Sequence, residues 1–186
     1  MKKSYYLLLL FTSIICFSQS DKPNEDRILY EKGMALNELY YNSNFFELTV
    51  ITKDENVSKI VKLISIQALE YFDKLVNDFP ESDLFIVSLY EKSMLELDLE
   101  QNKKAKESLL TLLNKKNSTQ NYYRNKSFIE LAKLYIEEKN YKKALLYLEE
   151  RIENGFHFSC GVELNTTLKR IESLKSTCVE GLKEKK

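Results

Sequence analysis

The sequence contains few of the residues on which many fold and function classes depend. Its 186 residues include four glycines, two prolines, one histidine and no tryptophan. So few turn-forming residues exclude a turn-rich β-sandwich, and also a doubly wound fold with several tight phosphate-binding loops. Long helices remain, and 44% apolar residues are enough to bury a core. The chain is therefore expected to be all-α.

The charges also lack an excess of either sign. Lys plus Arg number 28 and Asp plus Glu number 28, so the formal net charge is zero. A dedicated nucleic-acid-binding protein would carry a basic excess on one face. We therefore expect no nucleic-acid partner. The length suits one domain, or at most two small ones.

The N-terminal segment is typical of a secretory signal peptide. Lys2 and Lys3 form a positive start, and an uncharged, mainly apolar run follows over residues 5–17. This run is too short to serve comfortably as a permanent membrane-spanning helix, so no integral membrane span is expected once it is removed. We expect cleavage between Ser18 and Gln19, which leaves a mature chain with two net negative charges.

The alternative for this segment is a lipoprotein signal acylated at Cys16. Such a signal needs a small residue directly before the cysteine, and Ile15 stands there. The sequence therefore favours an exported chain, periplasmic or secreted, over a lipid-anchored one.

Apolar residues at spacings of three and four predict a series of amphipathic helices. The expected helices cover residues 27–41, 57–79, 83–98, 102–114, 122–138 and 141–152. Pro80 ends the second of them, and Ser82 would cap the third. Residues 42–56 are expected to form a loop that includes a short extended piece.

One short sequence pattern occurs three times in the chain. An alanine is followed four residues later by a bulky apolar residue at three places, Ala68 with Phe72, Ala105 with Leu109, and Ala144 with Leu148. The alanines are 37 and 39 residues apart. A small side chain is needed where two helix axes approach to about 8–10 Å. Each alanine is therefore expected where the second helix of a pair crosses the first.

These segments resemble tetratricopeptide repeats (TPRs). The best match, residues 128–155, carries the signature residues Phe128, Leu131, Ala132, Tyr135, Tyr141, Ala144 and Leu148. Residues 67–75, followed by Phe79 and Pro80, resemble the second helix of the same repeat. The middle copy matches less well, with Ser93 or Met94 at the small position and Glu96 or Leu97 at the tyrosine position. The resemblance covers about residues 60–155 and implies a short right-handed α-solenoid of about three helix pairs.

Such an array needs a terminal cap, because its last repeat has no neighbour to cover its apolar face. The sequence from Gly155 onward resembles the way these arrays often close, with a loop at Asn165–Thr166 and a capping helix from Thr167 to about Glu180. The chain then divides into a signal peptide (1–18), an N-terminal helix and loop (19–56), the TPR-like region (57–155) and a C-terminal cap (156–186).

No catalytic or metal-binding constellation stands out. His157 is the only histidine, and its place between Phe156 and Phe158 favours a structural role. Adjacent carboxylates such as Glu137 and Glu138 point in different directions on a helix, so a solvated face is the better interpretation. We expect no cofactor and no enzymatic activity. A hydrolase or metal enzyme is the minor alternative.

Cys160 and Cys178 remain after the signal peptide is removed, and an oxidising compartment favours a disulfide between them. If both lay on one straight helix, their 18-residue separation would span about 27 Å. A disulfide needs Cα atoms within about 7 Å. A break at Asn165–Thr166 could fold one arm back, so both outcomes stay open.

The resemblance implies non-enzymatic binding of another protein or peptide on the concave wall that the first helices form. In the best copy it places five residues there: Lys126, Ile129, Lys133, Ile136 and Glu137. Exposed aliphatic residues beside lysines would suit an extended acidic or amphipathic peptide. The alternative is a structural assembly subunit of an envelope complex. The identity of the partner and the oligomeric state stay open.

Overall fold

The computed structural model of the chain describes residues 24–42, 55–115, 121–153 and 161–184. Within these ranges the chain forms helices and no strand, so the all-α prediction is confirmed. In chain order the helices are α2 (Glu25–Asn42), α4 (Glu55–Asp78), α5 (Phe85–Asp98), α6 (Asn102–Asn114), α7 (Asn121–Glu137), α8 (Tyr141–Glu153) and α9 (Gly161–Lys183). The predicted helices from residue 27 to residue 152 match these bounds to within two residues.

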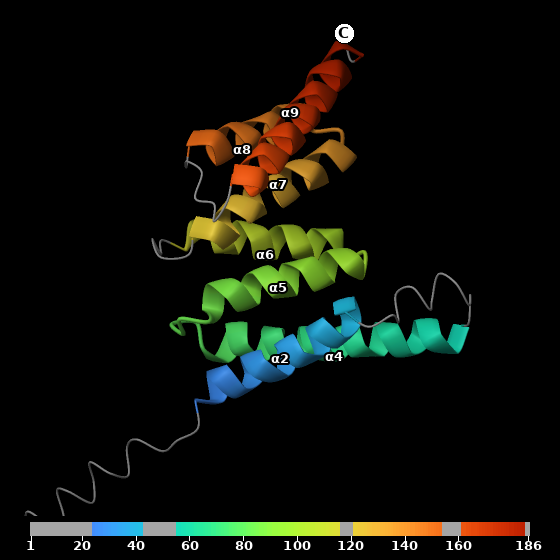
Figure 1. Ribbon diagram of the computed structural model, residues 1–186, viewed down its shortest axis with the longest axis vertical. Helices are drawn as coiled ribbons and strands as arrows, with labels where there is room; N and C mark the ends of the chain where they lie inside the picture. The colour runs from blue at the N-terminus through green and yellow to red at the C-terminus, as the bar shows by residue number, and fades with distance from the viewer. Residues whose placement is uncertain (1–23, 43–54, 116–120, 154–160, 185–186) are drawn as a thin grey trace, which may run out of the picture.

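The helices stack in an elongated row that follows the order of the chain (Figure 1). Each packs against the next one, and α7 additionally contacts α5 and α9. Helices α2, α5 and α7 run in one direction, whereas α4, α6 and α8 run in the opposite direction (Figure 1). We call the former the first helices and the latter the second helices. Helices α2 and α4, α5 and α6, and α7 and α8 therefore pack as antiparallel neighbours (Figure 1).

The predicted cap of α5 differs in detail from the structure. The helix begins at Phe85, and Leu84 is its N-cap residue without a side-chain hydrogen bond. Ser82 still satisfies part of this turn, because its Oγ accepts the Leu84 N–H at 3.1 Å. The same hydroxyl donates to Asp26 Oδ2 at 2.6 Å. Ser82 therefore ties the α4–α5 turn to the start of α2.

The turns after α5 and α7 have the same backbone geometry. Glu100 and Lys139 adopt positive φ angles of 59° and 56°. Each turn contains two hydrogen bonds from a backbone N–H to a backbone carbonyl. After α5, Gln101 donates to Glu96 and Glu100 donates to Leu97. After α7, Asn140 donates to Tyr135 and Lys139 donates to Ile136. These pairs of bonds form the Schellman ending of a helix. The two turns are 39 residues apart, the same interval that separates Ala105 from Ala144.

Small residues are buried on both helices of each pair. The recurring alanines Ala68, Ala105 and Ala144 are each 0% exposed. On the first helices, Gly33, Ser93 and Ala132 are buried as well. Small side chains at a crossing let two helix backbones approach closely. Gly33 was not recognised in the sequence as a member of this set.

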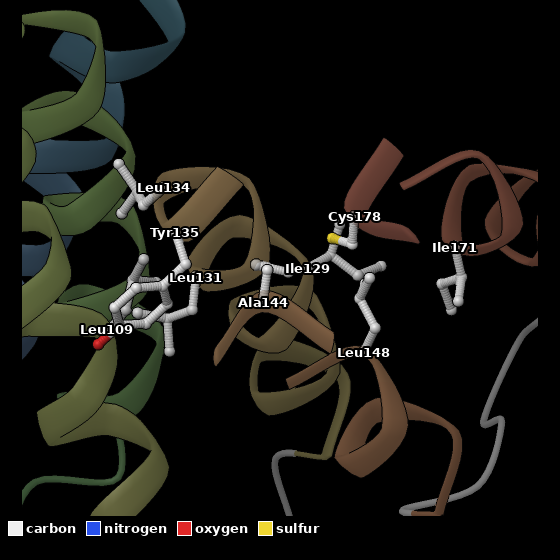
Figure 2. Close-up of a cluster of buried hydrophobic side chains, with 10 residues drawn as sticks. Leu109, Ile129, Leu131, Leu134, Tyr135, Ala144, Leu148, Ile171 and Cys178 are labelled. Carbon is white, nitrogen blue, oxygen red and sulfur yellow. The ribbon is translucent and has the colours of Figure 1, made fainter. Parts of the chain in front are cut away.

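The core is divided into clusters along the row. Near one end, Ala68 and Phe72 of α4 pack with Leu95 of α5. A second cluster contains Phe85, Ile86, Leu89, Tyr90 and Leu112. The third joins α6, α7, α8 and α9 and includes Leu109, Leu131, Ala132, Tyr135, Ala144, Leu148 and Ile171 (Figure 2). Apolar burial is therefore local, with each layer of helices covering its neighbours.

The C-terminal segment differs from the prediction. Helix α9 is continuous from Gly161 to Lys183 and passes through Asn165 and Thr166, so the predicted loop at these residues is wrong. Asn and Thr disfavour a helix only weakly, and the apolar residues Ile171 and Cys178 anchor α9 in the third cluster. Tertiary packing outweighs the local preference here.

The continuous helix also bears on the disulfide between Cys160 and Cys178, which the sequence left open. Cys178 is a free thiol and is 0% exposed. Gly161, the residue directly after Cys160 in the sequence, lies 17 residues before Cys178 on the same helix, which corresponds to about 26 Å. A disulfide needs Cα atoms within about 7 Å. A bond from Cys178 to the start of α9 is excluded by this distance, and Cys160 itself lies outside the described residues.

Several predictions fall on residues that the structure does not describe. These are the signal peptide with its cleavage site at Ser18–Gln19, the alternative anchor at Cys16, the histidine His157, and most of the loop 42–56. Among the helices that are described, none is long and apolar enough to cross a membrane.

Candidate functional site

Polar side chains of α2 and α5 meet on one side of the row. Tyr30, Asn37 and Tyr41 lie along one stripe of α2, because intervals of seven and four residues return to the same side of a helix. The Asn37 amide donates to Glu91 Oε2 at 2.9 Å, and the Tyr41 hydroxyl donates to Asp98 Oδ2 at 2.5 Å. Glu91 and Asp98 are two turns apart on α5. Two hydrogen bonds therefore join these stripes of α2 and α5.

Four tyrosine side chains from three helices gather next to these bonds. The ring centroids of Tyr90 and Tyr123 are 5.4 Å apart, and those of Tyr122 and Tyr123 are 5.3 Å apart. Burial raises the pKa of Tyr123, and the nearby Tyr30 hydroxyl of α2 raises it further. Rings at these separations attract one another through their quadrupoles. We call Tyr30, Tyr90, Tyr122 and Tyr123 the tyrosine cluster.

The carboxylate of Glu91 lies among these tyrosines. Burial is the main cause that raises the pKa values of Tyr30, Tyr90 and Tyr123, and the charge of Glu91 contributes in all three. Burial also raises the pKa of Glu91 itself, and this effect exceeds the lowering by the Asn37 hydrogen bond and by the charge of Lys126. Glu91 is therefore a partly desolvated carboxylate at a junction of α2, α5 and α7.

A second carboxylate on α5, Asp98, is more exposed than Glu91 but also accepts a hydrogen bond from α2. Burial raises the pKa of Asp98, and the hydrogen bond from Tyr41 opposes that shift. The pKa of Tyr41 is raised mainly by burial and, to a smaller extent, by its hydrogen bond to Asp98. We use the term first-helix face for the surface formed by the tyrosine cluster together with Asn37, Tyr41, Glu91, Asp98 and Lys126.

Only some of the five predicted groove residues reach the surface. Ile129 is 5% exposed and belongs to the same core cluster as Ile171 and Cys178 of α9 (Figure 2), so the expectation that it is exposed is wrong. Ile136 is partly buried against that cluster, and Glu137 is exposed. The cause is α9, which packs on α7 and removes part of its surface from solvent.

The two lysines of the predicted groove already have partners in the chain. Lys126 Nζ lies 4.3 Å from the centroid of the Tyr122 ring, within the range of a cation–π contact. Lys133 Nζ lies 2.7 Å from Glu130 Oε2, and Arg170 Nη2 of α9 lies 3.3 Å from Oε1 of the same carboxylate. Glu130 is therefore compensated by two cations.

A cavity of about 410 Å³ lies beside Tyr30, near the start of α2. Its lining residues come from α2, the segment before it and the α4–α5 turn: Asn24, Asp26, Arg27, Tyr30, Glu31, Ser82, Asp83 and Leu84. Three of these side chains are acidic and one is basic. The cavity shares Tyr30 with the first-helix face and adds an acidic hollow next to it.

Neither the tyrosine cluster nor Glu91 was predicted from the sequence. The predicted groove residues lie in the copy that best resembles the repeat, whereas much of the first-helix face belongs to α2 and α5. Signals were present: the chain has 12 tyrosines and no tryptophan. Tyr30, Asn37 and Tyr41 also share one helical stripe. What the sequence could not show is that this stripe faces Glu91 and Asp98.

The chemistry on this face is that of a binding surface, with aromatic rings, hydroxyl groups and carboxylate acceptors. Within the described ranges, no group of three or more His, Cys, Asp or Glu residues is arranged to hold a metal ion. Comparisons with protein-family models, with curated proteins and with solved structures find no match. The structure thus defines an all-helical protein, and its function has to be inferred from its own surface.

Proposed function

We propose that the protein is a non-enzymatic scaffold that binds another protein or peptide through the first-helix face. The observation that carries this proposal is the convergence of side chains from α2, α5 and α7 on Glu91 and the tyrosine cluster. Tyrosine combines a large apolar ring with a hydrogen-bonding tip, which is why it is enriched in protein interfaces.

The architecture that fits this function is a short TPR-like α-solenoid of three helix pairs, with α9 as its cap. Two features support it: the small residues buried on both helices of each pair, and the identical turns at Glu100 and Lys139. In such an array each unit packs only on its neighbours, and the first helices together line an extended surface. The first-helix face would be the concave wall of the solenoid.

We further propose that the chain is exported to the bacterial periplasm or cell envelope, as its N-terminal residues predict. N-terminal sequencing of the exported protein tests this directly, with Gln19 expected as the first residue. A product that retains the lysines at positions 2 and 3, or that begins with an acylated Cys16, would contradict it.

The alternative, an assembly subunit held by another surface, has one observation in its favour. Ile60 and Leu63 on α4, a second helix, are 48% and 64% exposed. Exposed aliphatic side chains next to each other on one helix are a common feature of contact surfaces. In this alternative α4 makes a permanent contact, and the first-helix face is not required.

Crosslinking and pull-down from the native envelope fraction distinguish the two proposals. The bait is the mature chain, compared with Tyr122→Ala on the first-helix face and with Leu63→Glu on α4. Tyr122 is 43% exposed, so its replacement leaves the core in place. Peptide or protein binding on the first-helix face predicts that partners are lost with the first variant and retained with the second. The reverse pattern would support the assembly subunit.

A further inference from the structure

The cations on and beside the first-helix face already have a carboxylate or an aromatic ring as a partner. The two carboxylates of this face, in contrast, form no ion pair within the described residues. Beside the face, toward α9, Lys133 and Arg170 both pair with Glu130. Lys126 lies over the Tyr122 ring. A partner that approaches here therefore meets cations whose charge is already engaged by the chain.

The carboxylates of α5 are in the opposite situation. Within the described part of the chain, Glu91 accepts a hydrogen bond from the neutral Asn37 amide, and Asp98 accepts one from the neutral Tyr41 hydroxyl. Neither carboxylate forms an ion pair within 4.0 Å among these residues. Lys126 is close enough to lower the pKa of Glu91, but burial has the larger effect and raises it. This part of the face therefore has two carboxylates that no ion pair neutralises within the described residues.

A buried acceptor beside Glu91 is also without a partner. Asn37 is 4% exposed, and while its amide nitrogen donates to Glu91, its Oδ1 accepts no hydrogen bond within the described residues. A buried polar atom without a partner costs about 1–3 kcal/mol, so natural proteins rarely keep one without a reason. The Asn37 oxygen, which has no donor, and the Glu91 carboxylate, which has no ion pair, are both hydrogen-bond acceptors. Each is complementary to a donor that carries positive charge.

We propose that the partner on the first-helix face is a basic, extended peptide segment, with an Arg or Lys side chain that docks at Glu91 between the tyrosines of α2, α5 and α7. The proposal rests on the binding function given above and adds the charge of the partner. A guanidinium group suits the position because it is planar, stacks on aromatic rings and offers five donors in a fixed fork. Asp98, two turns further along α5, and the acidic cavity beside Tyr30 would receive neighbouring basic residues.

This partner differs from the acidic or amphipathic peptide that the lysines in the sequence indicated. An acidic segment would place its charge next to Glu91 and Asp98, neither of which forms an ion pair within the described residues, and like charges at an interface are strongly unfavourable. The lysines behind the earlier expectation are engaged in contacts within the chain. The number of lysines in the predicted groove therefore does not indicate how much positive charge a partner would meet there.

The test is a selection from a random dodecapeptide display library on the mature chain. Peptides enriched in Arg and Lys are expected. The selected peptide is then measured by fluorescence anisotropy against Glu91→Gln/Asp98→Asn. Both replacements keep an acceptor oxygen for Asn37 and Tyr41, so the fold is preserved while two charges are removed. Binding should weaken at least tenfold, and it should also weaken as salt is raised from 50 to 300 mM.

The matched control is Glu107→Gln/Glu149→Gln, which removes the same charge from exposed positions on the second helices α6 and α8. Its affinity should stay within about twofold of the wild-type value, a difference of about 0.4 kcal/mol. Equal weakening by both double variants would mean that only the net charge matters, and it would overturn the proposed site.

The remaining outcomes separate this proposal from the function on which it rests. Selected peptides that are acidic or without charge bias, and that lose affinity for Tyr122→Ala, would overturn the basic partner but support peptide binding on the first-helix face. A selection that enriches no peptide would contradict both proposals.

Discussion

A Cβ atom on Gly33 of α2 would lie 2.8 Å from Cε1 and 2.9 Å from Cζ of Phe72 in α4. Carbon atoms in proteins are normally separated by about 3.5–4.0 Å. Phe72 is 0% exposed and packs with Ala68 and Leu95, so its ring is enclosed on several sides. The close approach of α2 to α4 therefore depends on the absence of a side chain at Gly33.

We predict that Gly33→Ala destabilises the protein. In an isolated helix this replacement gains about 1 kcal/mol. Here the added methyl group displaces the Phe72 ring, and overpacking of a core typically costs about 1–3 kcal/mol. The net effect should be a lower free energy of unfolding, measured by urea titration with circular dichroism. A stabilised variant would show that α2 does not lie this close to α4.

A glycine should instead stabilise the turn between α5 and α6. Glu100 has a φ angle of 59°, a conformation that glycine adopts without strain. Glu100→Gly is expected to raise the free energy of unfolding by about 0.5–1 kcal/mol. Glu107→Gly, the same replacement inside helix α6, should lower it by about 1 kcal/mol. Equal effects at the two positions would contradict the Schellman geometry of the turn.

The buried carboxylate of Glu96 should depend on Lys92. Glu96 is 2% exposed, accepts a hydrogen bond from Ser108 at 2.7 Å, and lies 3.6 Å from Lys92 Nζ, which also pairs with Asp73 at 2.8 Å. Lys92→Met leaves Glu96 buried without its cation and should cost about 3 kcal/mol. Adding Glu96→Gln should recover part of that loss, because the amide carries no charge. Urea titrations of the single and double variants measure the coupling between Lys92 and Glu96. An equal loss of stability in Lys92→Met and in the double variant would show that the charge of Glu96 does not depend on Lys92.

The stability of the protein should show a pH dependence that arises from Glu91 and Asp98. Burial raises the pKa of both carboxyl groups in the folded state above their ordinary values of 4.5 and 3.8. Between the ordinary and the raised pKa, the folded state binds more protons than the unfolded state. These two groups therefore make the protein less stable as pH rises through that window, and the cost persists above it.

Glu91→Gln/Asp98→Asn removes this cost, so it should raise the free energy of unfolding at pH 7 relative to the wild type. The difference between the two proteins should shrink as pH is lowered toward 4. Urea titrations at a series of pH values measure it. A difference that stays constant with pH would mean that neither carboxyl group has a raised pKa.

The thiol of Cys178 should be unreactive in the folded protein. It is 0% exposed, and burial raises its pKa, so little of the reactive thiolate is present. Iodoacetamide should label Cys178 only after unfolding, as judged by peptide mass spectrometry. A digest of the non-reduced protein should contain no peptide in which Cys160 is linked to Cys178. Detection of that peptide would mean that α9 is broken in solution.

Sequence patterns alone determined the helices and their order. The apolar spacings predicted the helices from residue 27 to residue 152 to within two residues. The alanine recurrence marked positions that prove to be buried. Both signals are local, because the spacing of apolar residues along a helix determines which side it buries. The low glycine and proline content excluded the classes of fold that need many tight turns.

Only the tertiary structure decided which side chains form the first-helix face. Ile129 looked like a surface residue in its repeat copy and is buried because α9 packs on α7. Lys133 is engaged by Glu130, and Glu91 gains its importance from Asn37, which is 54 residues away in the sequence. Asn165 and Thr166 remain helical in a helix that Ile171 and Cys178, further along α9, anchor in the core. Burial and charge compensation depend on which helices meet, and no single helix encodes that information.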